Sequence, residues 1–497
     1  MRVSPLTGHP PAAARVAAVV GEFLLIYAAA VVLPAGVAVL YGEHTALPFL
    51  SLAAASAALA LVLRRLGKWG PLDEREAMAT CAASWLLVSL AGAWPFYACL
   101  RVTPVDAVFE SVSGFTTTGM TVLSGLDRLP RSLLFWRCFT QYLGGIGILT
   151  FFLFVGFRKG TLAHRLFSAE GRHLHAGRPT PSVGRTVILF VVIYLTLTAT
   201  QTVALRLAGV DWFDSLTHAM TTSATAGFSN HDQSVAYYAQ AGYPHAGLIE
   251  GLFALFMILS GMNFLVLYRL GRGQLSALWD GGEIRWYWGF LVLAGLAVSA
   301  DVLFPSGGGE GAVGANLRAA GFQVAALTST TGLLTRQPYD PIFGGVARQT
   351  FLLLMLVGAC VGSTGGGLKM MRAMLLARVG LREMRRATVP AQAVTPLIVD
   401  GKIVEEGQVS RVAALGLALL MVIGVGALAA AALAGLSPAD AFSVSVSAVS
   451  NIGPTLVHPA RVMSFPAPLK LLLAVAMFVG RLEVFPVIAL LSRRTWR

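Results

Sequence analysis

Four short polar segments of the chain each carry a hydrogen-bonding residue two positions before a glycine. The segments are residues 106–120, 214–228, 319–333 and 440–454. Aligned on their glycines, they place in equivalent positions Thr117, Thr225, Thr330 and Asn451, and then Gly119, Gly227, Gly332 and Gly453. Glycine permits backbone angles that turn carbonyl oxygens toward a common axis. Because a ring of carbonyls replaces the hydration shell of a monovalent cation, the four segments predict an ion-selective filter.

The beginning of each segment indicates a short helix that points at the same axis. An aspartate stands thirteen residues before the glycine in three segments, as Asp106, Asp214 and Asp440, and Ala319 takes this place in the other segment. Aspartate is a favourable cap for a helix N-terminus, and the negative C-terminal end of such a helix attracts cations. One segment of this kind would be an ordinary polar loop, but four in register favour a pore. Glu110, within the first segment, either faces the outer vestibule or hydrogen-bonds nearby backbone.

A run of glycines interrupts the apolar sequence that follows the third segment. It reads Gly362, Ser363, Thr364, Gly365, Gly366 and Gly367. It lacks the Gly-Lys-Ser/Thr ending of a phosphate-binding loop, and no predicted strand precedes it. Consecutive glycines break a membrane helix, so the run predicts a gate just inside the filter; a kink without a gating role is the alternative. Arg481, in the last apolar run, either hydrogen-bonds carbonyls of this loop, pairs with an acidic residue, or extends toward the membrane surface.

The sequence around these residues is that of a helical membrane protein. Of its 497 residues, 56% are hydrophobic and 12% are charged, whereas about 25% of the residues of a soluble domain are charged. This composition excludes a soluble enzyme, and the long apolar runs argue against an outer-membrane barrel. A spanning helix needs about 20 mostly apolar residues. Runs of that kind start near Val16, Leu47, Met78, Leu133, Thr186, Gly247, Ile284, Gln349, Val412 and Leu469.

We therefore predict an all-α polytopic membrane protein with about ten transmembrane helices. Four repeats of span, re-entrant pore loop and span surround one pore, and two extra N-terminal helices precede them. The expected boundaries are 1–70 for the extra helices, and 71–160, 161–275, 276–400 and 401–497 for the four pore repeats. The third repeat contains the intramembrane glycine loop.

The basic residues serve as topology signals. The formal net charge is +13, and most of this charge lies in alternate short loops between apolar runs. Such a distribution places both termini in the cytoplasm and argues against a nucleic-acid partner. One basic loop contains His164, His173 and His175, for which a solvated loop is favoured over a metal site. The sequence shows no HExxH motif and no paired-carboxylate helix motif, so an integral-membrane enzyme is the disfavoured alternative.

The chain resembles the Trk/Ktr/HKT superfamily of potassium transporters, and the bacterial TrkH-type branch most closely. The resemblance extends over nearly the whole chain from about residue 15, and its matching stretches are residues 109–119, 134–148, 218–229, 328–332, 362–372, 450–454 and 480–485. It implies potassium ion uptake across the bacterial cytoplasmic (inner) membrane by a multi-pass protein surrounded by membrane lipids. In this superfamily a serine at the first filter glycine goes with sodium permeation, so Gly119 implies a preference for K⁺. A sodium-permeable or Na⁺-coupled transporter of the same superfamily is the alternative.

The resemblance also implies roles for individual residues and partners. The K⁺-binding filter would consist of Thr117, Thr118, Gly119, Thr225, Ala226, Gly227, Thr330, Thr331, Gly332, Asn451, Ile452 and Gly453. The gate would consist of Gly362 through Gly367 together with Arg481. K⁺ would be the transported ion, and no organic cofactor is expected in this chain. Members of the family are homodimers that bind a cytosolic ring of nucleotide-binding (NAD or ATP) regulatory subunits of the TrkA type.

Overall fold

The computed structural model describes residues 10–156, 183–304, 313–390 and 395–496. Within these ranges the named elements are helices except for one antiparallel hairpin, formed by β1 (Ile398–Val399) and β2 (Lys402–Ile403). The chain divides into two compact units. Outside the described residues lie the three histidines considered above for a metal site, His164, His173 and His175.

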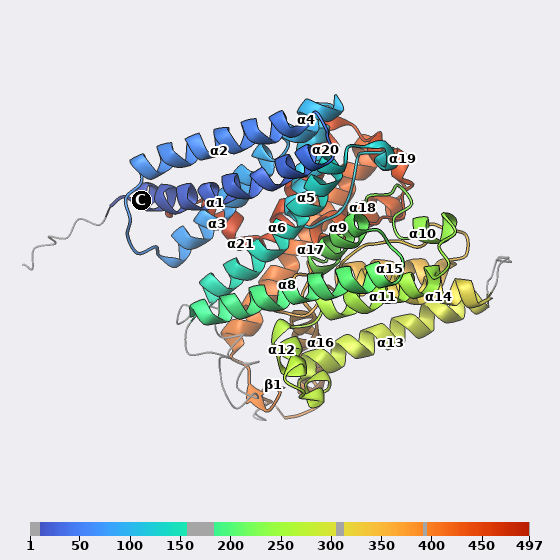
Figure 1. The fold of residues 1–497 in the computed structure, drawn as a ribbon. Helices are drawn as coiled ribbons and strands as arrows, with labels where there is room; N and C mark the ends of the chain where they lie inside the picture. Colours follow the sequence, from blue (N-terminus) through green and yellow to red (C-terminus); the bar gives the residue numbers. More distant parts are fainter. Residues whose placement is uncertain (1–9, 157–182, 305–312, 391–394, 497) are drawn as a thin grey trace, which may run out of the picture. The chain divides into compact units, whose positions relative to one another are not determined.

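The first unit consists of the residues up to Val112, Leu129–Trp136 and Leu482–Arg497. Its helices are α1 (Ala12–Leu40), α2 (Ala46–Leu66), α3 (Glu74–Ala91), α4 (Trp94–Leu100), α21 (Phe485–Leu491) and most of α5 (Pro104–Phe115). α1 and α2 are apolar along their length and lie side by side (Figure 1). α3 begins at a capping box formed by Asp73 and Glu76, and Glu76 also pairs with Arg15 of α1. This pairing matters because a buried carboxylate without a partner is strongly destabilising.

The second unit consists of Ser113–Arg128 and Arg137–Arg481, and it contains the predicted filter residues of all four segments. Most of α6 (Arg131–Gly156) belongs to it. The remaining helices, in chain order, are η1 (Leu126–Arg128), α8 (Val183–Leu207), α9 (Trp212–Ser223), α10 (Ala236–Gln240), α11 (Ala246–Ser260), α12 (Phe264–Gly271), η2 (Leu275–Leu278), α13 (Gly282–Leu303), α14 (Val313–Thr328), α15 (Gly345–Leu356), α16 (Met370–Arg386), α17 (Glu406–Ala434), α18 (Pro438–Ser450), α19 (Pro459–Met463) and α20 (Ala467–Arg481). The hairpin lies beneath α12 and α16 in the view of Figure 1.

The lengths of the helices confirm a polytopic, all-helical membrane protein. Among the described residues, six helices are long and apolar enough to cross a membrane, and the count rises to eight if each of two bent helix pairs is one span. The sequence predicted about ten spans. The other two apolar runs form α6 and α15, and α15 is only 12 residues long because the glycine run follows it.

The second helix of a repeat is interrupted more often than the sequence indicated. The expected break is present between α15 and α16. A further break separates α11 from α12, which meet at 110°, and the Asn263 side chain accepts a hydrogen bond from the Leu265 N–H there. α20 ends at Arg481, and both Glu483 and Val484 then adopt left-handed backbone angles. The Asn263 cap begins α12 after the first break. At the other break, two residues with positive φ angles precede α21, which has Pro486 in its first turn.

The aspartates predicted as N-terminal caps of the pore helices α5, α9 and α18 are wrong by about one turn; no cap was predicted for the pore helix α14. In α9 the cap is Asp211, whose side chain accepts hydrogen bonds from the N–H groups of Phe213 and Asp214. Since a cap bonds to groups two or three residues further along the chain, the predicted aspartates occupy the third helical position instead. Ala319 lies within α14, well past its first described residue. The same offset of three residues separates the capping side chains from the aspartates in the other two helices, Thr103 from Asp106 and Ser437 from Asp440.

Candidate functional site

The four pore helices end in the same backbone arrangement. The last turn closes with two backbone hydrogen bonds. Their donors are the N–H groups of the two residues that directly precede the filter glycine. In the first repeat these run from Thr117 N–H to Gly114 O and from Thr118 N–H to Ser113 O, both at 2.9 Å. Equivalent pairs, at 2.9–3.3 Å, end α9, α14 and α18. This is the Schellman arrangement, which requires a left-handed residue directly after the helix.

That left-handed residue is the threonine or asparagine singled out from the sequence. Its φ angle is 54° at Thr117, 50° at Thr225, 59° at Thr330 and 54° at Asn451. Residues with a side chain rarely adopt such angles, so four of them at equivalent positions mark a conformation held by its surroundings. The filter glycines, two residues later, are left-handed as well, with φ angles of 76–99°.

The four filter segments contact one another in a closed ring. A Cβ atom added to Gly119 would overlap the carbonyl oxygen of Ala226, the residue before the filter glycine of the second repeat. The same relation continues around the ring, from Gly227 to Thr331 O, from Gly332 to Ile452 O, and from Gly453 back to Thr118 O. Carbonyl groups of all four repeats therefore meet at one place, and side chains at the glycines are excluded by space as well as by backbone angle.

Three buried side chains brace this ring, and the sequence pattern predicted a role for only one of them, Asn451. Gln141 of α6 donates to Ala226 O at 2.8 Å and accepts from Phe228 N–H at 3.0 Å. Arg137, one turn earlier, donates to Ser229 O at 2.8 Å and lies over the Phe228 ring. Asn451 donates to the Thr118 hydroxyl at 2.9 Å and so joins the fourth segment to the first. Polar residues within an apolar run, as Arg137 and Gln141 are, would have been the signal.

A cavity of about 470 Å³ lies against the four filter glycines. Its wall includes His231, which stands between two carboxylates: Nδ1 is 2.5 Å from Asp127 Oδ1 and Nε2 is 2.8 Å from Asp214 Oδ2. A histidine that donates from both ring nitrogens is protonated. Burial alone lowers the pKa of His231, but its bonds to Asp214 and Asp127 outweigh burial and raise that pKa. Glu110, for which the sequence allowed either a place in the outer vestibule or a bond to nearby backbone, is completely buried in α5.

The glycine run forms a buried loop between α15 and α16. Its two ends are paired through Gly358 N–H to Leu368 O at 2.8 Å and Met370 N–H to Ala359 O at 3.1 Å. Ser363 and Thr364 at its tip are 3% and 0% exposed. The loop is thus a defined structure held at both ends.

The tip of the loop contacts the ends of three pore helices. Thr364 donates to Ser223 O at the end of α9 at 2.9 Å, and Gly366 N–H donates to the Thr330 hydroxyl after α14 at 2.9 Å. A Cβ atom added to Gly366 would overlap Ser450 O of α18. The loop therefore lies directly against the filter segments, where lipid supplies no hydrogen-bond partners.

Two buried cations hold the loop, one at the end of α20 and one at the residue directly before α16. Arg481, 3% exposed at the end of α20, donates to Thr364 O at 2.8 Å. It does not extend to the membrane surface. Lys369, for which no sequence pattern predicted a role, donates to Gly365 O. Two adjacent carbonyls of the loop thus receive charged donors, which form stronger hydrogen bonds than neutral ones.

The fold and this ring define a helical membrane protein of the cation-transporter class. The family model described as a cation transport protein, TrkH, matches residues 49–275 and 287–495. The chain belongs to the TrkH family. This is a family of transporters and not of enzymes.

The similarity to individual relatives covers nearly the full length. The Trk system potassium uptake protein TrkH of Salmonella typhimurium is 31% identical over 493 residues, covering 96% of this chain and 98% of that protein. An uncharacterized cation transporter of Methanocaldococcus jannaschii is 28% identical over 477 residues, covering 95% and 94%. The crystal structure of the potassium transporter TrkH from Vibrio parahaemolyticus superposes with a TM-score of 0.84 at 29% identity, covering 97% and 99%.

Proposed function

We propose that this protein takes up K⁺ across the cytoplasmic membrane, through the filter formed by the four re-entrant segments. The observation that carries the proposal is the closed ring in which each filter glycine contacts a carbonyl of the next repeat. Such a ring coordinates a dehydrated cation, and the pore helices direct their negative ends toward it. The relatives named as potassium uptake proteins support K⁺ as the ion.

The loop from Gly362 to Gly367 is the proposed gate. Its tip lies against the filter side of three pore helices, and Arg481 and Lys369 hold its carbonyls. Opening then requires these bonds to break together, which favours two discrete positions of the loop. The competing view, a structural kink, predicts that loosening the loop changes stability but not ion flux.

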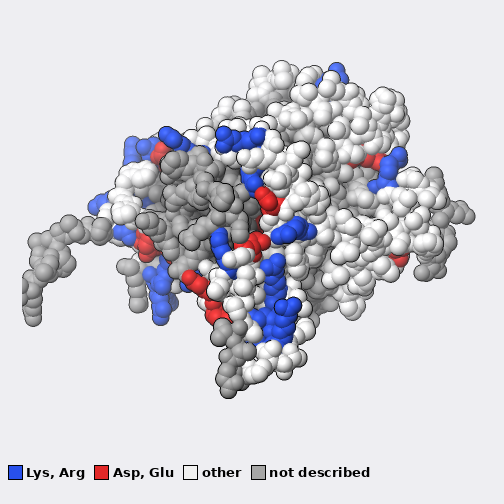
Figure 2. Space-filling model, turned by 90° about the horizontal axis from the view of Figure 1, so that it is seen from below, with Lys and Arg blue, Asp and Glu red and all other residues white. Residues whose placement is uncertain are grey.

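The proposed assembly is a homodimer whose cytoplasmic face binds a nucleotide-binding regulatory ring of the TrkA type. The name "Trk system" of the relatives supports such a partner. In the orientation that the basic loops predict, both termini and the hairpin β1–β2 face the cytoplasm. Figure 2 views the molecule from below, where Lys and Arg side chains gather with acidic side chains among them. Arg385 and Arg386, at the exposed end of α16, are the best placed for docking.

Flux into proteoliposomes tests the proposed function. The purified protein should accumulate ⁸⁶Rb⁺, and excess K⁺ should compete with it far better than excess Na⁺ does. Equal competition by the two ions would favour the sodium-permeable alternative. Imposed sodium and proton gradients, tested separately, show whether either ion is coupled to uptake. Liposomes without protein, and liposomes with heat-denatured protein, give the background.

A further inference from the structure

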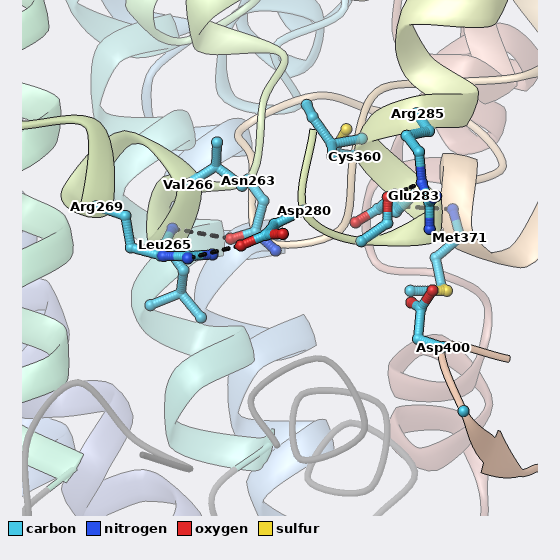
Figure 3. A pocket seen from close by; sticks show the side chains of 13 residues that line it. Asn263, Leu265, Val266, Arg269, Asp280, Glu283, Arg285, Cys360, Met371 and Asp400 are labelled. Carbon is cyan, nitrogen blue, oxygen red and sulfur yellow. Dashed lines mark hydrogen bonds and ion pairs between the residues drawn. The ribbon is translucent and has the colours of Figure 1, made fainter. Parts of the chain in front are cut away.

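Glu283 connects the two ends of the proposed gate. It is the second residue of α13 and is 6% exposed. Its Oε1 atom accepts a hydrogen bond from Val361 N–H at 2.7 Å and another from Met371 N–H at 3.1 Å. Val361 directly precedes the glycine run, and Met371 follows it in the first turn of α16. One carboxylate oxygen of α13 therefore holds both ends of the loop, as Figure 3 shows for Met371.

The residue before Glu283 is held by the hairpin. Gly282 N–H donates to Asp400 Oδ1 at 2.9 Å. Asp400 occupies the turn between β1 and β2 with a φ angle of 48°, a left-handed position at which aspartate is tolerated. Both carboxylates thus lie at the N-terminus of α13, where the helix dipole stabilises negative charge. Consecutive residues of α13 contact the hairpin on one side and the gating loop on the other.

The hairpin is in turn joined to α16, and α16 is joined to α17, the helix that follows the hairpin. Arg378 of α16 donates to Ile398 O of β1 at 3.0 Å. Arg382 of α16 pairs with Glu406, the first residue of α17, at 2.6 Å. A displacement of the end of α16 therefore moves the hairpin with it.

Beside these contacts lies a cavity of about 420 Å³, in which the parts have room to shift. Glu283, Asp400, Met371 and Cys360 all line it (Figure 3). The interior of a protein is normally close-packed and resists such shifts. Here the side chains that hold the loop border open space instead of a filled core.

We infer that Asp400, Gly282 and Glu283 form a link that transmits movement of the cytoplasmic hairpin to the gating loop. The inference rests on the proposed function in that it takes the glycine run as the gate. Pulling the hairpin away removes the bond to Gly282, shifts the first turn of α13, and weakens the hold of Glu283 on both ends of the loop. Glu283 and Asp400 are thus positioning residues that do not contact the transported ion. A coupling of this kind is established only by showing that the two residues depend on each other.

The thiol of Cys360 provides a reporter for the link that does not depend on transport. It is 1% exposed, precedes Val361 directly and lines the cavity. In a variant with Cys81, Cys99 and Cys138 replaced by alanine, the rate of Cys360 labelling by a soluble maleimide measures how often this end of the loop moves. We expect Glu283→Ala and Asp400→Ala each to raise that rate roughly tenfold, the scale of losing a buried hydrogen bond to a charged group. Glu283→Gln, whose amide oxygen still accepts both bonds, should label at nearly the wild-type rate.

The control and the double variant decide whether the link exists. Asp280→Ala is the matched control, because Asp280 lines the same cavity but pairs with Arg269 and not with the loop. It should leave the labelling rate unchanged. The double variant Glu283→Ala/Asp400→Ala should label no faster than Glu283→Ala alone. Rates that multiply in the double variant, or an Asp400→Ala variant with the wild-type rate, would overturn the link.

Folding and function are separated in the same experiment. Each variant is first shown to elute as a monodisperse protein. If Glu283→Ala does not fold, Glu283→Asp, whose side chain is shorter by one methylene, replaces it. The labelling rate of Cys360 should rise in this variant as well. Basal ⁸⁶Rb⁺ flux of the same variants then tests the gate. Linked labelling without a change in flux would keep the link and reject the glycine run as the gate.

Discussion

At the scale of single residues, the filter depends on positions where side chains carry a conformational cost. Thr117, Thr225, Thr330 and Asn451 are all left-handed, and a left-handed residue with a Cβ costs roughly 1–2 kcal/mol. Glycine would avoid that cost. At two of these positions the side chain forms a bond that glycine cannot, since Thr330 accepts from the glycine loop and Asn451 donates to the first filter segment. These two residues therefore tie their segments to the surroundings.

Replacement of Gly119 by serine should reduce the preference for K⁺ over Na⁺. The new Cβ would overlap Ala226 O, so the carbonyl must move out of the ring, and the hydroxyl offers a ligand suited to a smaller ion. We expect the selectivity ratio to fall about tenfold, equivalent to ~1.4 kcal/mol. Reversal potentials in mixed K⁺ and Na⁺ measure the ratio.

The control for this substitution is Gly125→Ser. Gly125 has a φ angle of 71°, close to the 79° of Gly119, but nothing lies within 4 Å of an added Cβ. It therefore reproduces the backbone strain without the overlap. Equal selectivity of the Gly119→Ser variant and the wild type would show that Gly119 does not belong to the filter.

Stability should decrease with rising pH because of His231. Its pKa in the folded protein is raised above the ordinary value near 6.5 by Asp214 and Asp127, against the effect of burial. The stabilisation by protonated His231 is thus complete below that ordinary value and is lost as the pH rises through the raised pKa. Thermal unfolding of the purified protein across this range should show the decrease, and His231→Gln should remove it. A decrease of the same size in His231→Gln would assign it to other groups.

At the scale of elements, each repeat combines a pore helix with a second helix that can be broken. α6 is continuous over 26 residues, whereas α11 and α12 meet at a bend and the glycine loop separates α15 from α16. A break exposes backbone groups that need partners where no water is present. In the third repeat these partners are filter residues and buried cations. The break between α15 and α16 thus occurs where neighbouring residues supply hydrogen bonds to the loop.

Weakening the glycine loop should increase ion flux in the absence of a partner. Arg481→Ala removes the donor to Thr364 O, and deletion of Gly365 to Gly367 removes the contacts with the ends of α14 and α18. We expect basal ⁸⁶Rb⁺ flux to rise several-fold in the first variant and more in the deletion, since a charged hydrogen bond contributes about 1.5–3 kcal/mol.

The variants with a weakened loop must fold for this comparison. Gel filtration shows whether they keep the oligomeric state of the wild type, and Arg481→Lys, which keeps one charged donor, should restore part of the closure. Well-folded variants that conduct no faster than wild type would mean that the loop is a kink and that the gate lies elsewhere.

At the scale of the whole molecule, the basic residues have two separate tasks. Arg378 and Arg382 of α16 are engaged within the chain, with Ile398 O and with Glu383 and Glu406. Arg385 and Arg386 at the end of the same helix are exposed, and Arg386 also pairs with Glu383 at 3.4 Å. Arg378 and Arg382 therefore join α16 to the hairpin and to α17, whereas Arg385 and Arg386 lie on the surface. Their sequence spacing alone does not separate the two tasks.

Charge reversal at Arg385 and Arg386 should weaken binding of the regulatory ring. We expect a loss of affinity of at least about tenfold, because complementary charges guide and hold such interfaces. Pull-down of the partner at low and high salt measures the effect. Reversal at Arg493 and Arg494, two exposed arginines of the C-terminal tail, is the matched control. If the control weakens binding equally, the end of α16 is not a specific docking site.

Much of this protein follows from local sequence patterns. The apolar runs predict the helices, because the lipid interior accepts only segments that satisfy their own backbone. The fourfold alignment on Gly119 and its equivalents predicts the filter segments, because a left-handed turn followed by glycine is a local requirement. The predicted caps were displaced by three residues. An aspartate such as Asp214 is favourable both as a cap and at the third helical position, so its presence does not distinguish the two.

The tertiary structure alone decided which groups meet. Asn451 bonds to Thr118 across 333 positions of sequence, and Glu283 bonds to Val361 across 78. Neither residue has a local pattern that names its partner, because the partner is a backbone or hydroxyl group that any sequence can supply. The closed ring of carbonyls has the same origin, since it exists only when four segments with similar sequences are brought around one axis. The sequence by itself determined the four glycine segments and the glycine run, and the packing of the repeats determined how they hold one another.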